Sequence, residues 1–138
     1  NLVTHFVSIM GNYSYAASTY KNYPNKDWQT KGFRIEKRVL PDSPKKTKVF
    51  HLPYAFLKDG TKYDMLDDLR KCSKPKLFVF GTKDTIAPPE IMQKAYQESA
   101  QPKEIFALDS DHDYRYNPSL VNTVNEAVGR FLDKYILQ

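Results

Sequence analysis

The sequence predicts an α/β fold in which parallel strands are joined by crossover helices. Three short apolar runs lack a helical period and suit strands buried on both faces: Leu2 to Met10, Lys76 to Phe80 and Glu104 to Leu108. A helix-start signal follows the second run, and a long amphipathic segment follows the third. Strand, helix, strand and helix with short links are typical of right-handed crossovers between parallel strands.

Each expected helix has its own signal. Pro88-Pro89-Glu90 places proline and an acidic residue in a first helical turn. After Asn117-Pro118, apolar residues recur at intervals of three and four as far as Ile136, which predicts an amphipathic terminal helix. Asp64 is expected to cap a shorter helix that precedes the second strand.

Residues 12–63 differ from the apolar runs, because they are rich in aromatic and polar side chains. Arg34 to Leu40 and Lys48 to Leu57 flank the turn formers Pro41-Asp42-Ser43-Pro44, which predicts a β-hairpin. We interpret residues 12–63 as a cap-like insertion into a single α/β domain that spans residues 1–138.

Composition excludes several classes of protein. The 138 residues match the common size of one domain, and the 41% apolar share argues against a disordered chain. No apolar run approaches the roughly 20 residues of a membrane span, so we expect no membrane partner. The net charge is +5, but only Pro44-Lys45-Lys46-Thr47-Lys48 clusters the lysines, which favours a solvated loop over a nucleic-acid partner. The histidines are scattered and no phosphate-binding loop occurs, so we expect neither metal nor cofactor.

Cys72 is the single cysteine and has no partner for an internal disulfide, which favours a reducing compartment and predicts a cytoplasmic location. The chain starts at Asn1 and runs directly into a strand-like segment. We therefore expect a truncated chain whose first strand has an unpaired edge. Such an edge promotes association, so a homo-oligomer is one expected outcome.

Candidate catalytic residues follow two of the expected strands. Asp84 lies four residues beyond Phe80, and His112 lies four residues beyond Leu108. Loops at the carboxyl ends of parallel strands collect functional groups, and neighbouring strands lie about 4.8 Å apart. The two side chains are therefore expected to meet within hydrogen-bonding distance. A carboxylate that holds an imidazole is the acid and base part of a nucleophilic triad.

These residues resemble the end of an α/β-hydrolase. The resemblance rests on Pro75-Lys-Leu-Phe-Val-Phe-Gly-Thr-Lys-Asp84, on Ala87-Pro88, on Asp111-His112-Asp113 and on the long terminal helix. The order of acid before histidine also fits that family. The resemblance implies that the chain is the C-terminal part of an α/β-hydrolase fold, with Asp84 and His112 as catalytic residues.

The middle of the chain adds a weaker resemblance to bacterial cinnamoyl or feruloyl esterase-like hydrolases with a small hairpin cap. It rests on Tyr54-Ala-Phe-Leu-Lys-Asp59 and Tyr63-Asp64. The implied function is a serine-type hydrolase of carboxylic esters, with a small-molecule ester as substrate. Thioesters, amides, carbon–carbon bonds and acyl transfer use the same triad and stay open.

The sequence departs from the family at the nucleophile. Gly-x-Ser-x-Gly occurs nowhere in the chain, and Ser14 in Gly11-Asn12-Tyr13-Ser14 is expected to be a surface serine. The implied partner is a missing N-terminal half of the same fold that carries the nucleophile and the oxyanion hole. The alternative is a non-catalytic binding or scaffold module, and a nucleic-acid binder is the third reading.

Other aromatic and histidine residues keep two readings. Trp28, Tyr54 and Phe56 either line an acyl or aryl pocket or hold the cap together. His5 is expected to be a satisfied core residue, and His51 a packed or exposed residue of the hairpin.

Overall fold

The computed structural model describes residues 3–14, 25–40 and 43–136. Contacts within the chain divide it into two compact units. The first, which we call the sheet unit, comprises Asn1–Tyr13 and Met65–Gln138, and the second, the hairpin unit, comprises Ser14–Asp64. The hairpin unit covers nearly the same residues as the expected insertion over 12–63, and its role as a cap stays a prediction.

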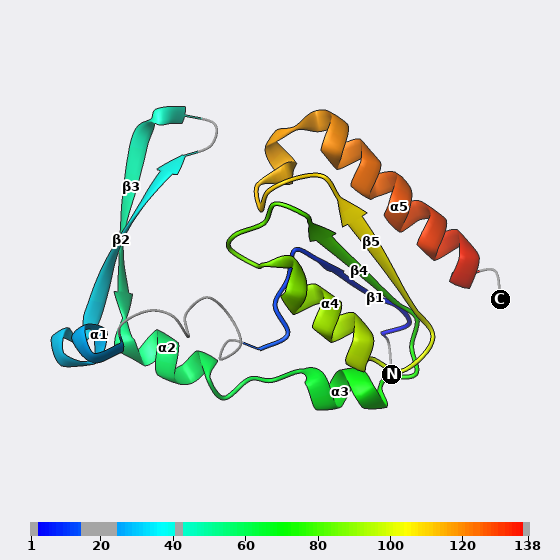
Figure 1. The fold of residues 1–138 in the computed structure, drawn as a ribbon, viewed down its shortest axis with the longest axis horizontal. Helices are drawn as coiled ribbons and strands as arrows, with labels where there is room; N and C mark the ends of the chain where they lie inside the picture. Colours follow the sequence, from blue (N-terminus) through cyan, green and yellow to red (C-terminus); the bar gives the residue numbers. More distant parts are fainter. Residues whose placement is uncertain (1–2, 15–24, 41–42, 137–138) are drawn as a thin grey trace. The chain divides into compact units, whose positions relative to one another are not determined.

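The sheet unit contains a three-stranded parallel sheet in the order β1-β4-β5 (Figure 1). The strands are β1 (Phe6–Ile9), β4 (Lys76–Gly81) and β5 (Lys103–Leu108). All of β4 is buried, whereas β1 and β5 are mostly half-buried. Burial on both faces was therefore predicted correctly for β4 alone. Only this strand has a neighbour on each side within the described residues, and β1 is shorter than the expected strand over Leu2 to Met10.

Helices cover both faces of this sheet (Figure 1). They are α3 (Leu66–Lys71), α4 (Pro89–Glu98) and α5 (Pro118–Ile136), and a 3-10 turn (Tyr114–Tyr116) precedes α5. Both long helices begin at the proline signals that predicted them. The links β4-α4-β5 form the expected crossover between parallel strands.

Successive side chains of β4 enter two different hydrophobic clusters, as the period of a strand requires. Leu77 and Val79 pack with Val124 and Phe131 of α5. On the other face lie residues of β4, α3 and α4: Phe78, Phe80, Leu69, Met92 and Ala95. Strand β4 therefore packs against the helices on both faces of the sheet. This packing fixes the position at which the loop after β4 begins.

Lys76 is fully buried at the start of β4 and has a structural role. Its Nζ donates hydrogen bonds to the carbonyls of Cys72 and Lys74 at 2.6 and 2.7 Å. Burial lowers the pKa of this lysine. Lys103, its register partner on β5, donates in the same way to three carbonyls at the end of α4, at 2.7 to 2.9 Å. Both lysines satisfy carbonyls that follow or end a helix.

The hairpin unit is built from α1 (Asn25–Lys31), β2 (Phe33–Leu40), β3 (Ser43–Pro53) and α2 (Tyr54–Gly60). The antiparallel pair β2-β3 confirms the expected hairpin, but Ser43 already belongs to a strand rather than to the turn. The second arm was wrongly extended to Leu57. The chain becomes helical at Tyr54, and α2 buries Leu57 alone, so no apolar repeat marks it.

Helix α1 was not predicted, because Trp28 is its sole large apolar side chain and gives no periodic signal. The expected cap of α3 was also wrong. Met65, rather than Asp64, occupies the N-cap position, and the Met65 side chain makes no capping hydrogen bond. Asp64 instead pairs with Ser14 in an isolated antiparallel bridge, which holds its backbone outside the helix.

Candidate active site

Asp84 and His112 meet at the carboxyl edge of the parallel sheet. His112 Nδ1 lies 2.9 Å from Asp84 Oδ2. Gly81 at the end of β4 is in register with Leu108 at the end of β5, so the loops that follow start side by side. The predicted contact between these side chains is confirmed, while their catalytic roles stay a prediction.

The Asp84 carboxylate is fixed through both oxygens. Its side chain is fully buried. Oδ1 accepts hydrogen bonds from the backbone amides of Ile86 and Ala87, each at 2.8 Å. Oδ2 remains for the imidazole of His112. This short turn therefore presents one oriented acceptor to the ring.

Gly81 lets the two loops approach each other. A Cβ atom at this position would lie 2.6 Å from the Ser110 carbonyl oxygen and 3.0 Å from that of Asp111. The amide of Lys83 donates to the same Ser110 carbonyl at 3.0 Å. Sequence analysis missed this role. The signal was a glycine between an apolar strand and the acidic loop, a position where close backbone approach is common.

His112 presents its other nitrogen away from the acid. The ionised carboxylate at Nδ1 favours the tautomer with a proton on that nitrogen, which leaves Nε2 as an acceptor. Nε2 has no hydrogen-bond partner among the residues that the structure describes. The side chain is 25% exposed, so an incoming group can reach it. This is the state in which an imidazole can take a proton from a nucleophile.

The acids beside His112 do not hold its ring. Asp111 Oδ1 accepts the amide of Asp113 at 2.9 Å, and Asp113 Oδ1 lies 3.1 Å from Arg115. Both carboxylates are therefore engaged within their own loop. Asp84 is the acid that orients the ring, as the chain order of the two strands predicted.

Solved structures with a similar fold were found at low sequence identity. The esterase domain of a Rhodothermus marinus protein is 17% identical, with a TM-score of 0.63 over 97% of this chain and 52% of that one. The α/β-hydrolase GrgF from Penicillium sp. sh18 is 11% identical, with a TM-score of 0.69 over 99% of this chain and 57% of that one. No family model and no curated protein sequence matches the chain.

This is an α/β-hydrolase fold. The chain spans about half the length of the two solved structures.

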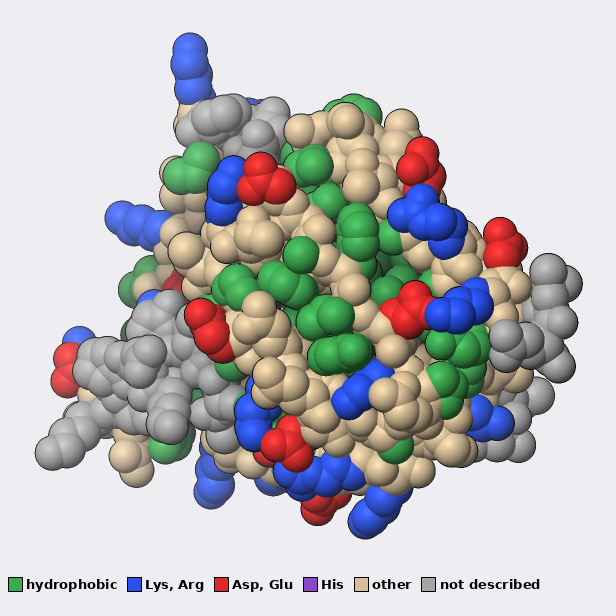
Figure 2. All heavy atoms as spheres, turned by 45° about the vertical axis from the view of Figure 1, so that its right-hand side comes forward, with side chains coloured by type: hydrophobic (Ala, Val, Ile, Leu, Met, Phe, Trp, Pro, Cys, Tyr) green, Lys and Arg blue, Asp and Glu red, His purple; other side chains and the backbone are tan. Residues whose placement is uncertain are grey.

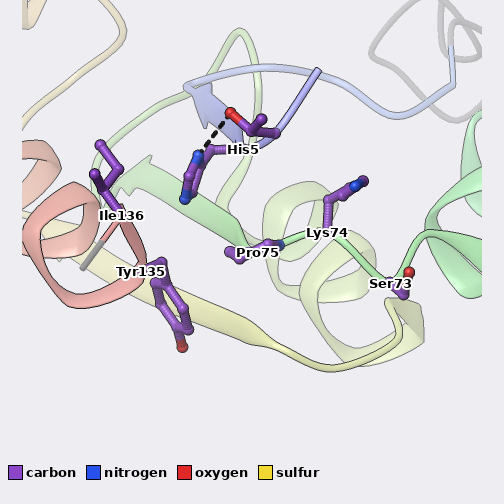
Figure 3. A pocket seen from close by; sticks show the side chains of 7 residues that line it. His5, Ser73, Lys74, Pro75, Tyr135 and Ile136 are labelled. Atoms are coloured by element: carbon purple, nitrogen blue, oxygen red, sulfur yellow. Dashed lines mark hydrogen bonds between the residues drawn. The ribbon is translucent and has the colours of Figure 1, made fainter. Parts of the chain in front are cut away.

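Two hollows of the sheet unit are lined by residues other than Asp84 and His112. One, of about 370 Å³, is lined by residues that adjoin the pair in sequence, among them Lys83, Asp111 and Tyr114. The other, of about 570 Å³, is drawn in Figure 3 and lies beside the residues that precede β1 and β4. This second hollow is at the opposite sheet edge from the pair, so it is not the place where Nε2 would act.

His5 borders the second hollow and differs from its prediction. Its Nδ1 lies 3.0 Å from Thr4 Oγ1 (Figure 3). The ring also packs edge-on to Phe131, with a centroid distance of 6.1 Å. The ring is half-buried, and its buried Nε2 has no hydrogen-bond partner within the described part of the chain. The expected satisfied core histidine is therefore wrong, because the residue lies before the strand rather than within it.

The other candidates lie in the hairpin unit. Ser14 is buried, so the expectation of a surface serine is wrong. Trp28 is buried and its Nε1 donates to the Leu52 carbonyl at 2.9 Å, which shows that it holds this unit together. Phe56 is 49% exposed. His51 is exposed and stacks on a neighbouring phenylalanine, as expected.

No cluster of three or more metal-ligating side chains occurs among the residues that the structure describes. Over the same residues, no helix combines the length and the apolar character that a membrane span requires.

Proposed function

We propose that the chain supplies the acid and the base of a serine-type hydrolase of carboxylic esters. The observation that carries the proposal is the 2.9 Å contact between His112 Nδ1 and Asp84 Oδ2 at the carboxyl edge of the sheet. A buried, doubly anchored carboxylate that orients an imidazole is the arrangement that activates a hydroxyl nucleophile.

The serine belongs to a segment that precedes this chain in the same fold, which makes this chain the C-terminal half. His112 Nε2 accepts the serine proton while the serine oxygen attacks the ester carbonyl carbon. The imidazolium, stabilised by Asp84, then gives that proton to the leaving alcohol as the ester C–O bond breaks. Water repeats both steps, releases the carboxylic acid and restores the serine.

Ester hydrolysis is the chemistry we favour, because the sequence resembles ester hydrolases and one structural neighbour is described as an esterase domain. An aromatic acyl group is the finer choice that the weaker resemblance suggests. A cytoplasmic location fits the single cysteine.

The decisive experiment uses the native protein with its preceding segment and a fluorophosphonate probe that labels activated serines. We expect labelling, and turnover of a short-chain aryl ester that falls by around ten-thousandfold in Asp84→Asn, the size seen in the best-studied protease triad. Asp109→Asn is the matched control, because Asp109 is an exposed acid of the same sheet edge that pairs with Lys83 at 2.8 Å.

Two results would contradict the proposal. A folded protein that the probe does not label would be a non-catalytic module. Equal turnover in Asp84→Asn and Asp109→Asn would remove Asp84 from the mechanism. The 138-residue chain alone should show no turnover, since an acid and a base without a nucleophile form no acyl-enzyme.

A further inference from the structure

One face of the β2-β3 hairpin is apolar and open. We call it the open face, and the register places on it Phe33, Ile35, Lys37, Val39, Thr47, Val49, His51 and Pro53. Ile35, Val39 and Val49 are 51%, 58% and 54% exposed. Phe33 is 42% exposed and stacks on His51 with a centroid distance of 5.5 Å. A continuous row of exposed apolar side chains marks a surface that another molecule covers.

On the opposite face, the part next to α1 is charged and better covered, whereas Arg38, Lys48 and Phe50 nearer the tip are exposed. Arg34 and Glu36 form an ion pair at 3.0 Å, with about a quarter of each side chain exposed. The Arg34 guanidinium lies 5.9 Å from the ring centroid of buried Trp28. Within the hairpin unit, Trp28 of α1 therefore packs against the charged face. The apolar face is left exposed and available to a partner.

Charge separates the two units of the chain. The hairpin unit contains 11 Lys and Arg and 5 Asp and Glu, a net charge of +6, whereas the sheet unit contains 10 and 11, a net charge of −1. No ion pair within the described residues uses the cations on or near the hairpin tip: Lys37, Arg38, Lys45, Lys46 and Lys48. On the face drawn in Figure 2, by contrast, acidic and basic side chains lie next to each other in several places.

We infer that the open face binds the surface of an anionic phospholipid membrane. Aliphatic side chains with Lys37 among them, next to the lysines of the hairpin tip, match an acyl layer beneath negatively charged headgroups, and a bilayer offers both in one flat surface. A second copy fits less well, because pairing two open faces would bring the Lys37 side chains of both copies toward each other. This inference departs from the expectation of no membrane partner, which rested on the shortness of the apolar runs; surface binding needs no spanning segment.

The test is flotation of the chain with vesicles of phosphatidylcholine alone and with 30% phosphatidylserine. Binding is expected to the anionic vesicles and to weaken as salt rises, because surface charges are screened within about 8 to 10 Å. Lys37→Glu should weaken binding about tenfold, because Lys37 is the lysine on the open face, each basic residue near such a surface contributes on the order of a fivefold gain, and reversal also adds repulsion. Val49→Ser should weaken it about fivefold, through the loss of buried apolar groups.

The sheet unit offers matched controls. Lys71→Glu changes the net charge as Lys37→Glu does, at an exposed lysine without an ion pair in the described chain. Val3→Ser removes an apolar side chain that is 59% exposed, against 54% for Val49. Both should bind as the unaltered chain does. Fluorescence of Trp28, the single tryptophan, reports whether the hairpin unit of each variant is folded.

Three outcomes would overturn the inference. One is the absence of binding to anionic vesicles. Another is binding that hairpin and control variants weaken equally. The third is a dimer in solution that Val49→Ser dissociates while vesicles stay unbound, which would assign the open face to a second copy. The inference does not depend on the proposed hydrolase, because no outcome involves Asp84 or His112.

Discussion

The two units of this chain place their apolar side chains in opposite ways. In the sheet unit, β4 is buried between α5 on one face and α3 and α4 on the other. In the hairpin unit, the apolar face of β2-β3 is exposed and the charged face is the one that packs. The difference shows that crossover helices cover both faces of a parallel sheet, whereas a two-stranded antiparallel sheet lacks enough neighbouring elements to cover both of its faces.

The ionic groups show the same contrast. Arg70 reaches Glu98 at 2.7 Å and Lys134 reaches Glu104 at 2.7 Å, so each of these contacts joins separate elements of the sheet unit. Five cations of the hairpin have no such contact in the described residues. In the sheet unit, ion pairs between elements accompany the fixed pair of Asp84 and His112. In the hairpin unit, the cations stay available for a partner of opposite charge, as the inference above requires.

The largest expected effect comes from removing one core side chain in each unit. Phe131→Ala should destabilise the sheet unit by about 3 to 5 kcal/mol, because Phe131 is 1% exposed and packs against β4. Trp28→Ala should cost the hairpin unit a similar amount but leave the His112 ring signals in NMR spectra unchanged. Loss of those signals in both variants would mean that the units do not fold separately.

A smaller effect is expected from a methyl group between the loops that carry Asp84 and His112. Gly81→Ala should destabilise the chain by about 1 to 3 kcal/mol, because the added Cβ meets two backbone carbonyls that must move. Gly129→Ala is the control, since nothing lies within 4 Å of a Cβ there and alanine is the better helix former. Urea unfolding measures both. Unaltered stability and unaltered His112 ring signals in Gly81→Ala would refute the role of Gly81.

Acid should loosen the sheet unit through Glu98. Hydrogen bonds from Lys94 and Arg70 hold the pKa of Glu98 far below its ordinary range, at about 2. A lowered carboxyl pKa stabilises the fold above the ordinary value, and this contribution disappears as pH falls toward 2. Thermal unfolding of Glu98→Gln should therefore depend less on pH in that window than unfolding of the unaltered chain. The control is Glu126→Gln, because Glu126 makes a longer contact of 3.8 Å.

The smallest expected change concerns substrate preference. If the full-length protein is the proposed ester hydrolase, Phe56→Ala should shift the ratio of kcat/KM between aryl and short alkyl esters by several-fold, since one apolar contact contributes about 1 to 3 kcal/mol. Ile136→Ala in the sheet unit, at a residue that is 62% exposed, should leave the ratio unchanged. Equal losses on every ester would indicate lost packing in the hairpin unit instead.

The sequence alone determined the sheet unit and its pair of loops. Apolar runs, the prolines before α4 and α5 and the order of Asp84 and His112 are local signals, and parallel neighbours bring such loops to one edge. Sequence analysis failed where the signal was not periodic: at α1 with one large apolar side chain, at the start of α2 and at the cap of α3.

Only the tertiary structure decided how the pair is held and which face of the hairpin is open. The two amides on Asp84 Oδ1 and the approach of the Ser110 carbonyl to Gly81 depend on how separate loops pack. Alternation along β2 and β3 defines two faces but does not say which is covered. The packing of Trp28 beside Arg34 decided which face is covered, because it places helix α1 against the charged face.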